Sequence, residues 1–312
     1  MPYALFDDLP PTHLQIGGGR VDVAFAPGDS APSQERLLGW ISDAARAVAA
    51  YYGRLPVKRV RVLVTRAPGR GIRNGTTFGY RGAAINVTVG RDTQANDLTD
   101  DWVMTHEMVH LALPGMGDEH DWLDEGIATY VEPLARAQSG QVPPQKVWAD
   151  LVWGLPKGLP GVDDRGLDHT PTWGRTYWGG ALFCLLADLE IRQRTANRQG
   201  LQDALRAVVA AGGNVETRWP IERILDTADR ATGVPVLHEL YDRMKAAPVA
   251  VDLGDLWRRL GVRGEGERLT LDDSAPLAAV RRAIVAGAPV AAKIALVPEA
   301  HRLAAKPANR SK

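Results

Sequence analysis

The pattern of apolar and polar residues changes along the chain, from alternation in the first third to helical spacing in the rest. Residues 11–25 alternate about Gly17–Gly19, which predicts two short strands joined by a glycine turn. Residues 57–65 and 76–89 are rich in β-branched residues and predict further strands. Between them, residues 67–74 are rich in glycine and arginine and predict a mobile loop.

Helical spacing of apolar residues first occurs at Gln34–Tyr52, where Ser33 is a candidate N-cap and Gly53 ends the pattern. After residue 97 this spacing dominates the chain. It predicts helices over residues 99–113, 121–139, 175–196, 200–211, 219–231, 235–247, 252–260 and 275–287.

Strands grouped first and helices grouped afterwards predict an α+β fold with two lobes. We expect an N-terminal mixed β-sheet lobe over residues 1–97 and a mostly α-helical C-terminal lobe over residues 98–312. The boundary falls beside the predicted helix 99–113. A cleft between two lobes is a common place for an active site, so this helix is the first place to look for chemistry.

The composition is that of a globular, electrically balanced protein. The chain has 312 residues, of which 45% are hydrophobic, so it can bury a large core. Lysine and arginine together number 37, as do aspartate and glutamate, and the formal net charge is zero. This balance gives no electrostatic support for a nucleic-acid partner.

Cysteine usage and the first residues bear on disulfide content and on the cellular compartment. Cys184, the one cysteine, lies in the apolar run Ala181–Ala187, which predicts an inert core residue and excludes a disulfide framework. Residues 1–10 lack the basic and apolar regions of a signal peptide, and no segment approaches the length of a membrane span. We expect a cytoplasmic protein if Met1 is the native start, and a periplasmic or secreted one if a leader has been removed.

The predicted helix 99–113 carries the pattern H-E-x-x-H at His106, Glu107 and His110. Residues four apart lie on the same helical face, so both histidines can present a ring nitrogen to one metal ion. Glu107 can then reach a water on the metal instead of the metal itself. This arrangement of two ligands and a base is typical of zinc hydrolases.

Two histidines leave a zinc site one protein ligand short. The best candidate is Glu125, 15 positions after His110, in the predicted helix 121–139. The intervening Leu113–His120 contains the proline and glycines needed to end one helix and reverse the chain. A second helix antiparallel to the first would then bring Glu125 to the metal.

These segments carry a family resemblance. H-E-x-x-H followed by Trp122-Leu-Asp-Glu-Gly-Ile-Ala resembles the gluzincin metallopeptidases, and it is similar to the W-L-x-E-G segment of the glycyl and alanyl aminopeptidase families. Downstream, Tyr177–Arg192 resembles their Y-x-K-G-A helix, with Gly179 where lysine is common. The resemblance covers about residues 50 to 262.

The resemblance implies a zinc-dependent peptidase with a thermolysin-like catalytic domain, acting on a peptide or protein substrate. It implies that His106, His110 and Glu125 bind Zn²⁺ and that Glu107 activates the metal-bound water. It also implies that Tyr177 donates a hydrogen bond to the oxyanion of the transition state.

Several neighbouring residues have candidate supporting roles. His169, in a polar loop, competes with Tyr177 as the oxyanion donor. Thr129 lies one helical turn after Glu125, and it and Glu132 are candidate acceptors for the second N–H of a ligand histidine. Tryptophans in Val147–Pro156, with Trp173 and Trp178, either line the cleft or pack in the core.

The sequence leaves open whether the protein recognises the amino terminus of a peptide substrate. Aminopeptidases of these families bind the free amine through a glutamate on a strand before the metal helix. The corresponding Gly79–Val87 has no acidic residue and contains Arg81, so we expect either endopeptidase action or amine binding through Asp118, Glu119 or Asp121. Two alternatives to a peptidase remain, namely a zinc hydrolase of a non-peptide substrate and a catalytically idle peptide-binding relative.

Overall fold

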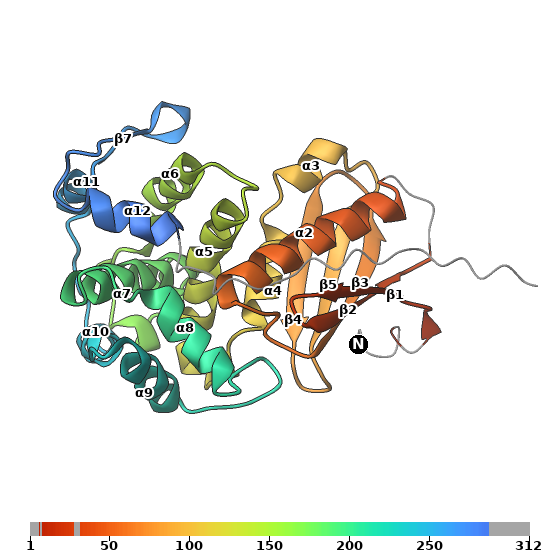
Figure 1. Ribbon diagram of the computed structural model, residues 1–312, viewed down its shortest axis with the longest axis horizontal. Coiled ribbons are helices and arrows are strands. Elements are labelled where there is room, and N and C mark those ends of the chain that lie inside the picture. Colours follow the sequence, from red (N-terminus) through yellow and green to blue (C-terminus); the bar gives the residue numbers. More distant parts are fainter. Residues whose placement is uncertain (1–5, 7, 28–31, 287–312) are drawn as a thin grey trace, which may run out of the picture.

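The computed structural model describes residues 6, 8–27 and 32–286 of the chain. Its larger sheet lies in the N-terminal part and most of its helices in the C-terminal part, as the hydrophobic pattern predicts (Figure 1). Among the described residues, no helix combines the length and the apolar character that crossing a membrane requires.

The N-terminal part is built on a five-stranded mixed sheet with the strand order β1-β2-β3-β5-β4. The β1–β2 and β4–β5 pairs are antiparallel, whereas β2–β3 and β3–β5 are parallel. Its strands are β1 (Thr12–Ile16), β2 (Gly19–Phe25), β3 (Arg59–Ala67), β4 (Ile72–Phe78) and β5 (Ala84–Gly90). In the β1–β2 turn, Gly17 and Gly18 have φ of 55° and 78°, a conformation that glycine adopts without strain.

One face of this sheet is apolar and carries helix α2 (Gln34–Tyr52), which crosses the strands (Figure 1). The alternating valines of β2, β3 and β5 on this face are fully buried and belong to the same core as Leu37 and Ile41 of α2. As predicted, Ser33 caps the helix, accepting a hydrogen bond from the Arg36 backbone N–H, and Gly53 ends it in the left-handed conformation.

The C-terminal part is helical, and α4 and α5 lie between the sheet and the helices that follow them in the chain (Figure 1). The helices are α3 (Ala95–Thr99), α4 (Val103–His110), α5 (Asp121–Gln138), α6 (Pro144–Gly154), α7 (Gly180–Arg194), α8 (Leu201–Ala210), α9 (Ile221–Thr232), α10 (Val236–Met244), α11 (Leu253–Leu260) and α12 (Ala278–Ala286). This part also contains short 3₁₀ turns and a two-stranded hairpin. The turns are η1 (Asp118–His120), η2 (Leu155–Gly158), η3 (Leu167–His169) and η5 (Gly266–Arg268), and the hairpin consists of β6 (Val262–Arg263) and β7 (Thr270–Leu271). The predicted end of the last helix, residue 287, lies outside the described residues.

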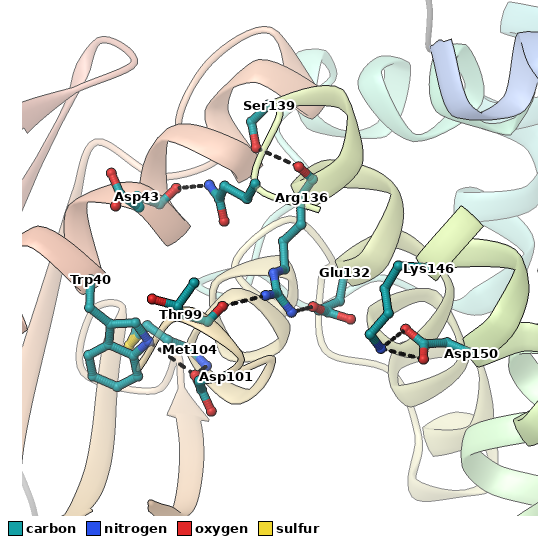
Figure 2. A network of polar contacts seen from close by, with 11 residues as sticks. Trp40, Asp43, Thr99, Asp101, Met104, Glu132, Arg136, Ser139, Lys146 and Asp150 are labelled. Atoms are coloured by element: carbon teal, nitrogen blue, oxygen red, sulfur yellow. Dashed lines mark hydrogen bonds and ion pairs between the residues drawn. The ribbon is translucent and has the colours of Figure 1, made fainter. Parts of the chain in front are cut away.

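The predicted single helix over 99–113 is wrong, because the chain breaks between α3 and α4. Asp101 causes the break: its Oδ2 accepts hydrogen bonds from the Met104 backbone N–H and from Trp40 Nε1, both at 3.1 Å. A carboxylate that accepts from the first turn of a helix stabilises its N-terminus. Asp101 therefore stabilises the start of α4 and links it to α2 (Figure 2).

Three further expectations need correction. Part of the predicted loop 67–74 is strand β4, which pairs with β5 through a register shift between Ile72 and Asn74. Residues 144–154 form α6, which the pattern did not predict. The predicted helix 175–196 opens with the π-helical turn η4 (Gly174–Gly179) before α7 begins.

Candidate metal centre

Helices α4 and α5 bring the three predicted ligands together. Glu125 Oε2 lies 3.1 Å from His106 Nε2 and 3.5 Å from His110 Nε2. One ligand atom from each residue lies within 4.8 Å of the others. Donors bound at about 2.0–2.1 Å to a tetrahedral zinc ion are about 3.4 Å apart, so this set fits zinc.

Burial and charge prepare these groups for a cation. His106 and His110 are buried. Burial by itself would raise the pKa of the Glu125 carboxyl, but its hydrogen bonds to the two imidazoles lower that pKa far below its usual value. Burial opposes protonation of His110, yet Asp124 and Glu125 raise its pKa well above 6.5. The site therefore holds concentrated negative charge next to two nitrogen donors.

The partner of the second ring nitrogen of His110 is Asp124, which sequence reasoning missed. Its Oδ1 lies 3.0 Å from His110 Nδ1. The predicted acceptors were wrong: Glu132 instead pairs with Arg136 at 3.0 Å, and the buried Thr129 Oγ1 has no hydrogen-bond partner among the described residues. Asp124 directly precedes Glu125, so adjacency to the third ligand was the available signal.

Glu107 is held from the edge strand of the sheet. The Thr77 hydroxyl donates to Glu107 Oε2 at 2.6 Å and also lies 2.9 Å from the Glu107 backbone oxygen. A Cβ atom at Gly75 would lie 2.5 Å from Glu107 Cγ and 2.7 Å from Oε1. The absence of a side chain at residue 75 therefore makes room for this carboxylate beside β4.

Tyr177 lies in the π-helical turn η4 and faces His106 of α4. Its ring stacks on the His106 ring with centroids 6.2 Å apart and planes at 15°. Burial, reinforced by the charge of Glu125 and a hydrogen bond to it, raises the pKa of Tyr177 to about 12. The phenol therefore keeps its proton. The competing candidate, His169, is exposed in η3 and is not among the residues lining the pocket beside His106.

The tryptophans divide between the two roles considered. Trp148 is buried in the core. Trp153, Trp173 and Trp178 instead line a pocket of about 390 Å³ beside His106. The sequence pattern does not separate them, because exposure depends on how α6 and η4 pack against the core.

The strand next to Glu107 is β4, not the expected segment 79–87. Strand β4 is the sheet edge, and its sequence Ile72-Arg-Asn-Gly-Thr-Thr-Phe78 likewise contains no acidic residue. Arg81 is exposed beyond it. Asp118 and Glu119 lie in η1, before Asp121. Burial is the main cause that raises the pKa of Asp121, and the charges of Asp118 and Glu119 raise it further. These acids therefore gather at the start of α5.

Comparison with solved structures shows that this fold is shared with zinc aminopeptidases, the M1 metallopeptidases. An aminopeptidase N family protein from Idiomarina loihiensis matches with a TM-score of 0.61 and 13% identity, over 82% of this chain and 49% of that chain. The M1 zinc metallopeptidase from Deinococcus radiodurans matches with a TM-score of 0.50 and 18% identity, over 78% of this chain and 52% of that chain.

The chain thus spans about half the length of these solved structures. No family model matches the sequence, and no curated protein matches it. The likeness is one of fold. The roles of individual residues rest on the geometry around α4 and α5.

Proposed function

We propose that this protein is a zinc-dependent peptidase of the gluzincin type. The observation that carries the proposal is the convergence of His106, His110 and Glu125 beside Glu107, a carboxylate held by Thr77. We further propose a thermolysin-like arrangement, with residues 1–97 and 98–312 as the two lobes of one catalytic unit. The fold likeness to M1 metallopeptidases supports both points.

Zinc at this site would polarise the scissile carbonyl and lower the pKa of water to near neutrality. Glu107 would act as the general base, taking a proton from the attacking water and passing it to the leaving amine. The Thr77 hydroxyl donates to Glu107 Oε2, which fixes the orientation of the carboxylate and leaves Oε1 to accept the proton.

Tyr177 would stabilise the oxyanion that forms when water adds to the carbonyl. This role needs a protonated donor at working pH, and a pKa of about 12 supplies one. Stacking on His106 holds the ring beside the metal ligand. Placement in a π-helical turn adds support, since such turns occur frequently at functional sites.

The substrate would lie extended along β4. This strand is the edge of the five-stranded sheet and lies next to Glu107, and an extended peptide can pair with such an edge. The lack of an acidic residue on β4 favours endopeptidase action. The acids Asp118, Glu119 and Asp121 offer the other route, capture of a free amine.

The decisive experiment compares the wild type with Glu107→Gln, measuring bound zinc and peptide turnover. We expect both proteins to bind zinc and the variant to lose about 10²–10⁴-fold in kcat, because the general base is gone. Glu35→Gln, which removes an exposed carboxylate in the first turn of α2, is the matched control and should retain turnover. Activity surviving in Glu107→Gln would refute the mechanism. Zinc binding without peptide cleavage by the wild type would favour a non-peptide substrate or a binding role.

A second comparison separates the two modes of cleavage. The same peptide is offered with a free and with an acetylated amino terminus, and the products are mapped by mass spectrometry. Endopeptidase action predicts internal cleavage of both forms at similar rates. Removal of single residues from the free peptide alone would instead assign amine recognition, with Asp118, Glu119 and Asp121 as the residues to substitute next.

A further inference from the structure

A pocket of about 390 Å³ opens next to the metal centre, between α4, α5, α6 and η4. His106 and Tyr177 line it, so a group in this pocket would lie beside one proposed metal ligand and the proposed oxyanion donor. Thr129 and Pro133 of α5 also line it. Its remaining walls are largely aromatic and consist of Trp102, Trp153, Trp173 and Trp178.

Three of these tryptophans are unusually exposed. Trp102, Trp153 and Trp173 have 52%, 64% and 59% of their surface accessible. The other exposed large hydrophobic residues among those described, Tyr80 and Val162, do not line the pocket. Exposed apolar surface gathered in a concave site marks a place where a ligand is bound.

The aromatic rings form a continuous surface that leads to the metal ligand. Trp173 stacks on Tyr177 with centroids 5.9 Å apart, and Tyr177 stacks on His106. Trp102 approaches His106 from another direction, edge to face at 5.3 Å. Farther out, Trp153 meets Trp178 edge to face at 5.8 Å. An apolar side chain in the pocket would contact rings on several sides.

Four charged residues of the pocket form two ion pairs. Arg136 pairs with Glu132 at 3.0 Å, and Lys146 pairs with Asp150 at 2.5 Å (Figure 2). Arg136 also donates to the backbone oxygen of Thr99 at 2.9 Å. The exposed Asp100 is the one further acidic residue of the lining. Because the paired side chains carry no net charge and the other walls are largely aromatic, the pocket favours an apolar group.

A second hollow of about 1240 Å³ lies along α6. Lys146, Asp150 and Trp153 line both hollows. Gly264–Leu269, between β6 and β7, also lines the second. Trp153 is therefore the aromatic residue that the two hollows share.

From these features we propose that the pocket receives a large aromatic or branched aliphatic side chain of the peptide substrate, adjacent to the cleaved bond. This inference rests on the proposed peptidase function and narrows its substrate class. Trp153, at the junction of the two hollows, is the residue expected to contribute most to selectivity.

Quenched fluorescent peptides that differ at a single position test the proposal. Alanine, leucine, phenylalanine, lysine and aspartate are placed in turn at each position flanking the bond cleaved by the zinc-loaded wild type. At one flanking position we expect kcat/KM for phenylalanine or leucine to exceed that for alanine by about 10–200-fold, the range for burying an apolar group in a pocket. Lysine and aspartate should be poorer than leucine.

Substitution at Trp153 ties that preference to the pocket. Trp153→Ala should reduce the phenylalanine-to-alanine ratio at least fivefold, Trp153→Phe should largely restore it, and Val162→Ala, at an exposed site outside the pocket, should not change it. Cleavage by the wild type with a ratio below about twofold at every flanking position would overturn the inference and leave the peptidase function intact. An unchanged ratio in Trp153→Ala would also overturn it.

Binding without turnover separates this inference from the proposed function. In zinc-loaded Glu107→Gln, calorimetry should show at least tenfold tighter binding of the phenylalanine peptide than of its alanine counterpart, and Trp153→Ala in that background should remove the difference. This result would support the pocket even if the wild type cleaved neither peptide. Equal affinities for the two peptides would refute it.

Discussion

Asp124 Oδ1 lies 3.0 Å from His110 Nδ1, while His110 Nε2 faces Glu125 at 3.5 Å. Two successive residues of α5 thus contact the two nitrogens of one imidazole. A carboxylate on the second nitrogen fixes the orientation of the ring and increases its basicity, and losing such a partner typically costs 10–100-fold in metal affinity. We therefore expect Asp124→Ala to weaken zinc binding by about 10–100-fold, measured by competition with a chelator.

The control for this prediction is Asp121→Ala. It removes a neighbouring carboxylate of the same helix that forms no ion pair with either ligand histidine. Its zinc affinity should stay within about threefold of the wild type, and Asp124→Asn, which keeps an acceptor oxygen, should fall between. Equal affinity in Asp124→Ala and the wild type would contradict the role of Asp124.

Gly75 should be essential for activity but not for folding. An alanine Cβ would come within 2.5 Å of Glu107 Cγ, and Glu107 is a flexible side chain that can move away. We expect Gly75→Ala to lower kcat at least tenfold with less than about 1 kcal/mol lost in the free energy of unfolding. Parallel turnover and urea-unfolding measurements check this. A fully active variant would show that Glu107 does not need its observed position.

Tyr177→Phe should lower kcat and leave zinc content unchanged. Removing one donor to an oxyanion costs about 10²–10³ in kcat, whereas binding in the ground state is little affected. Tyr241→Phe is the control, since it removes a hydroxyl that donates to Asp168 at 2.9 Å instead. The control should lose stability and not kcat. Equal losses of kcat in both variants would argue against an oxyanion role for Tyr177.

Gly126 allows α5 to approach the start of α7. A Cβ at this position would lie 2.4 Å from the backbone of Gly180, so neither helix can keep its place. Because overpacking of this kind costs about 1–3 kcal/mol, we expect Gly126→Ala to destabilise the protein by at least that amount. Gly39→Ala in α2, where a Cβ meets nothing within 4 Å, should be neutral or stabilising. Denaturant unfolding of both variants makes the comparison.

Cys184 should be unreactive in the folded protein. Burial raises the pKa of its thiol well above the usual value, and the thiolate is the reactive form. A chromogenic disulfide reagent at pH 8 should detect no thiol in the native protein and one after denaturation. Rapid labelling of the native protein would mean that α7 opens readily, contrary to the packing seen here.

The sequence and the structure agree where a local pattern carries the information. Alternating valines predicted the strands and the apolar spacing of Gln34–Tyr52 predicted α2, because these periods decide which side chains face a core. The spacing of His106 and His110 likewise required one shared helical face. Neither result depends on knowing what lies opposite the element, and both were predictable from neighbouring residues.

The break at Asp101 shows the limit of such patterns. Apolar spacing runs on through the α3–α4 junction, and the chain bends there because Trp40, some 60 positions earlier, donates to the carboxylate that caps α4. Similarly, the first part of β4, Ile72–Asn74, was predicted to be a loop. Its strand conformation comes from pairing with β5 and not from its own Gly- and Arg-rich composition.

By itself, the sequence determined the order of strands and helices, the pair of histidines on one helical face and the glutamate in the following helix. The tertiary structure alone decided that Asp124 supports His110, that Thr77 and Gly75 hold Glu107, and which tryptophans stay exposed. The physical reason is the separation along the chain over which each interaction acts. Periodicity and capping act within a few residues, whereas a hydrogen-bond partner or a pocket wall depends on which distant elements pack together.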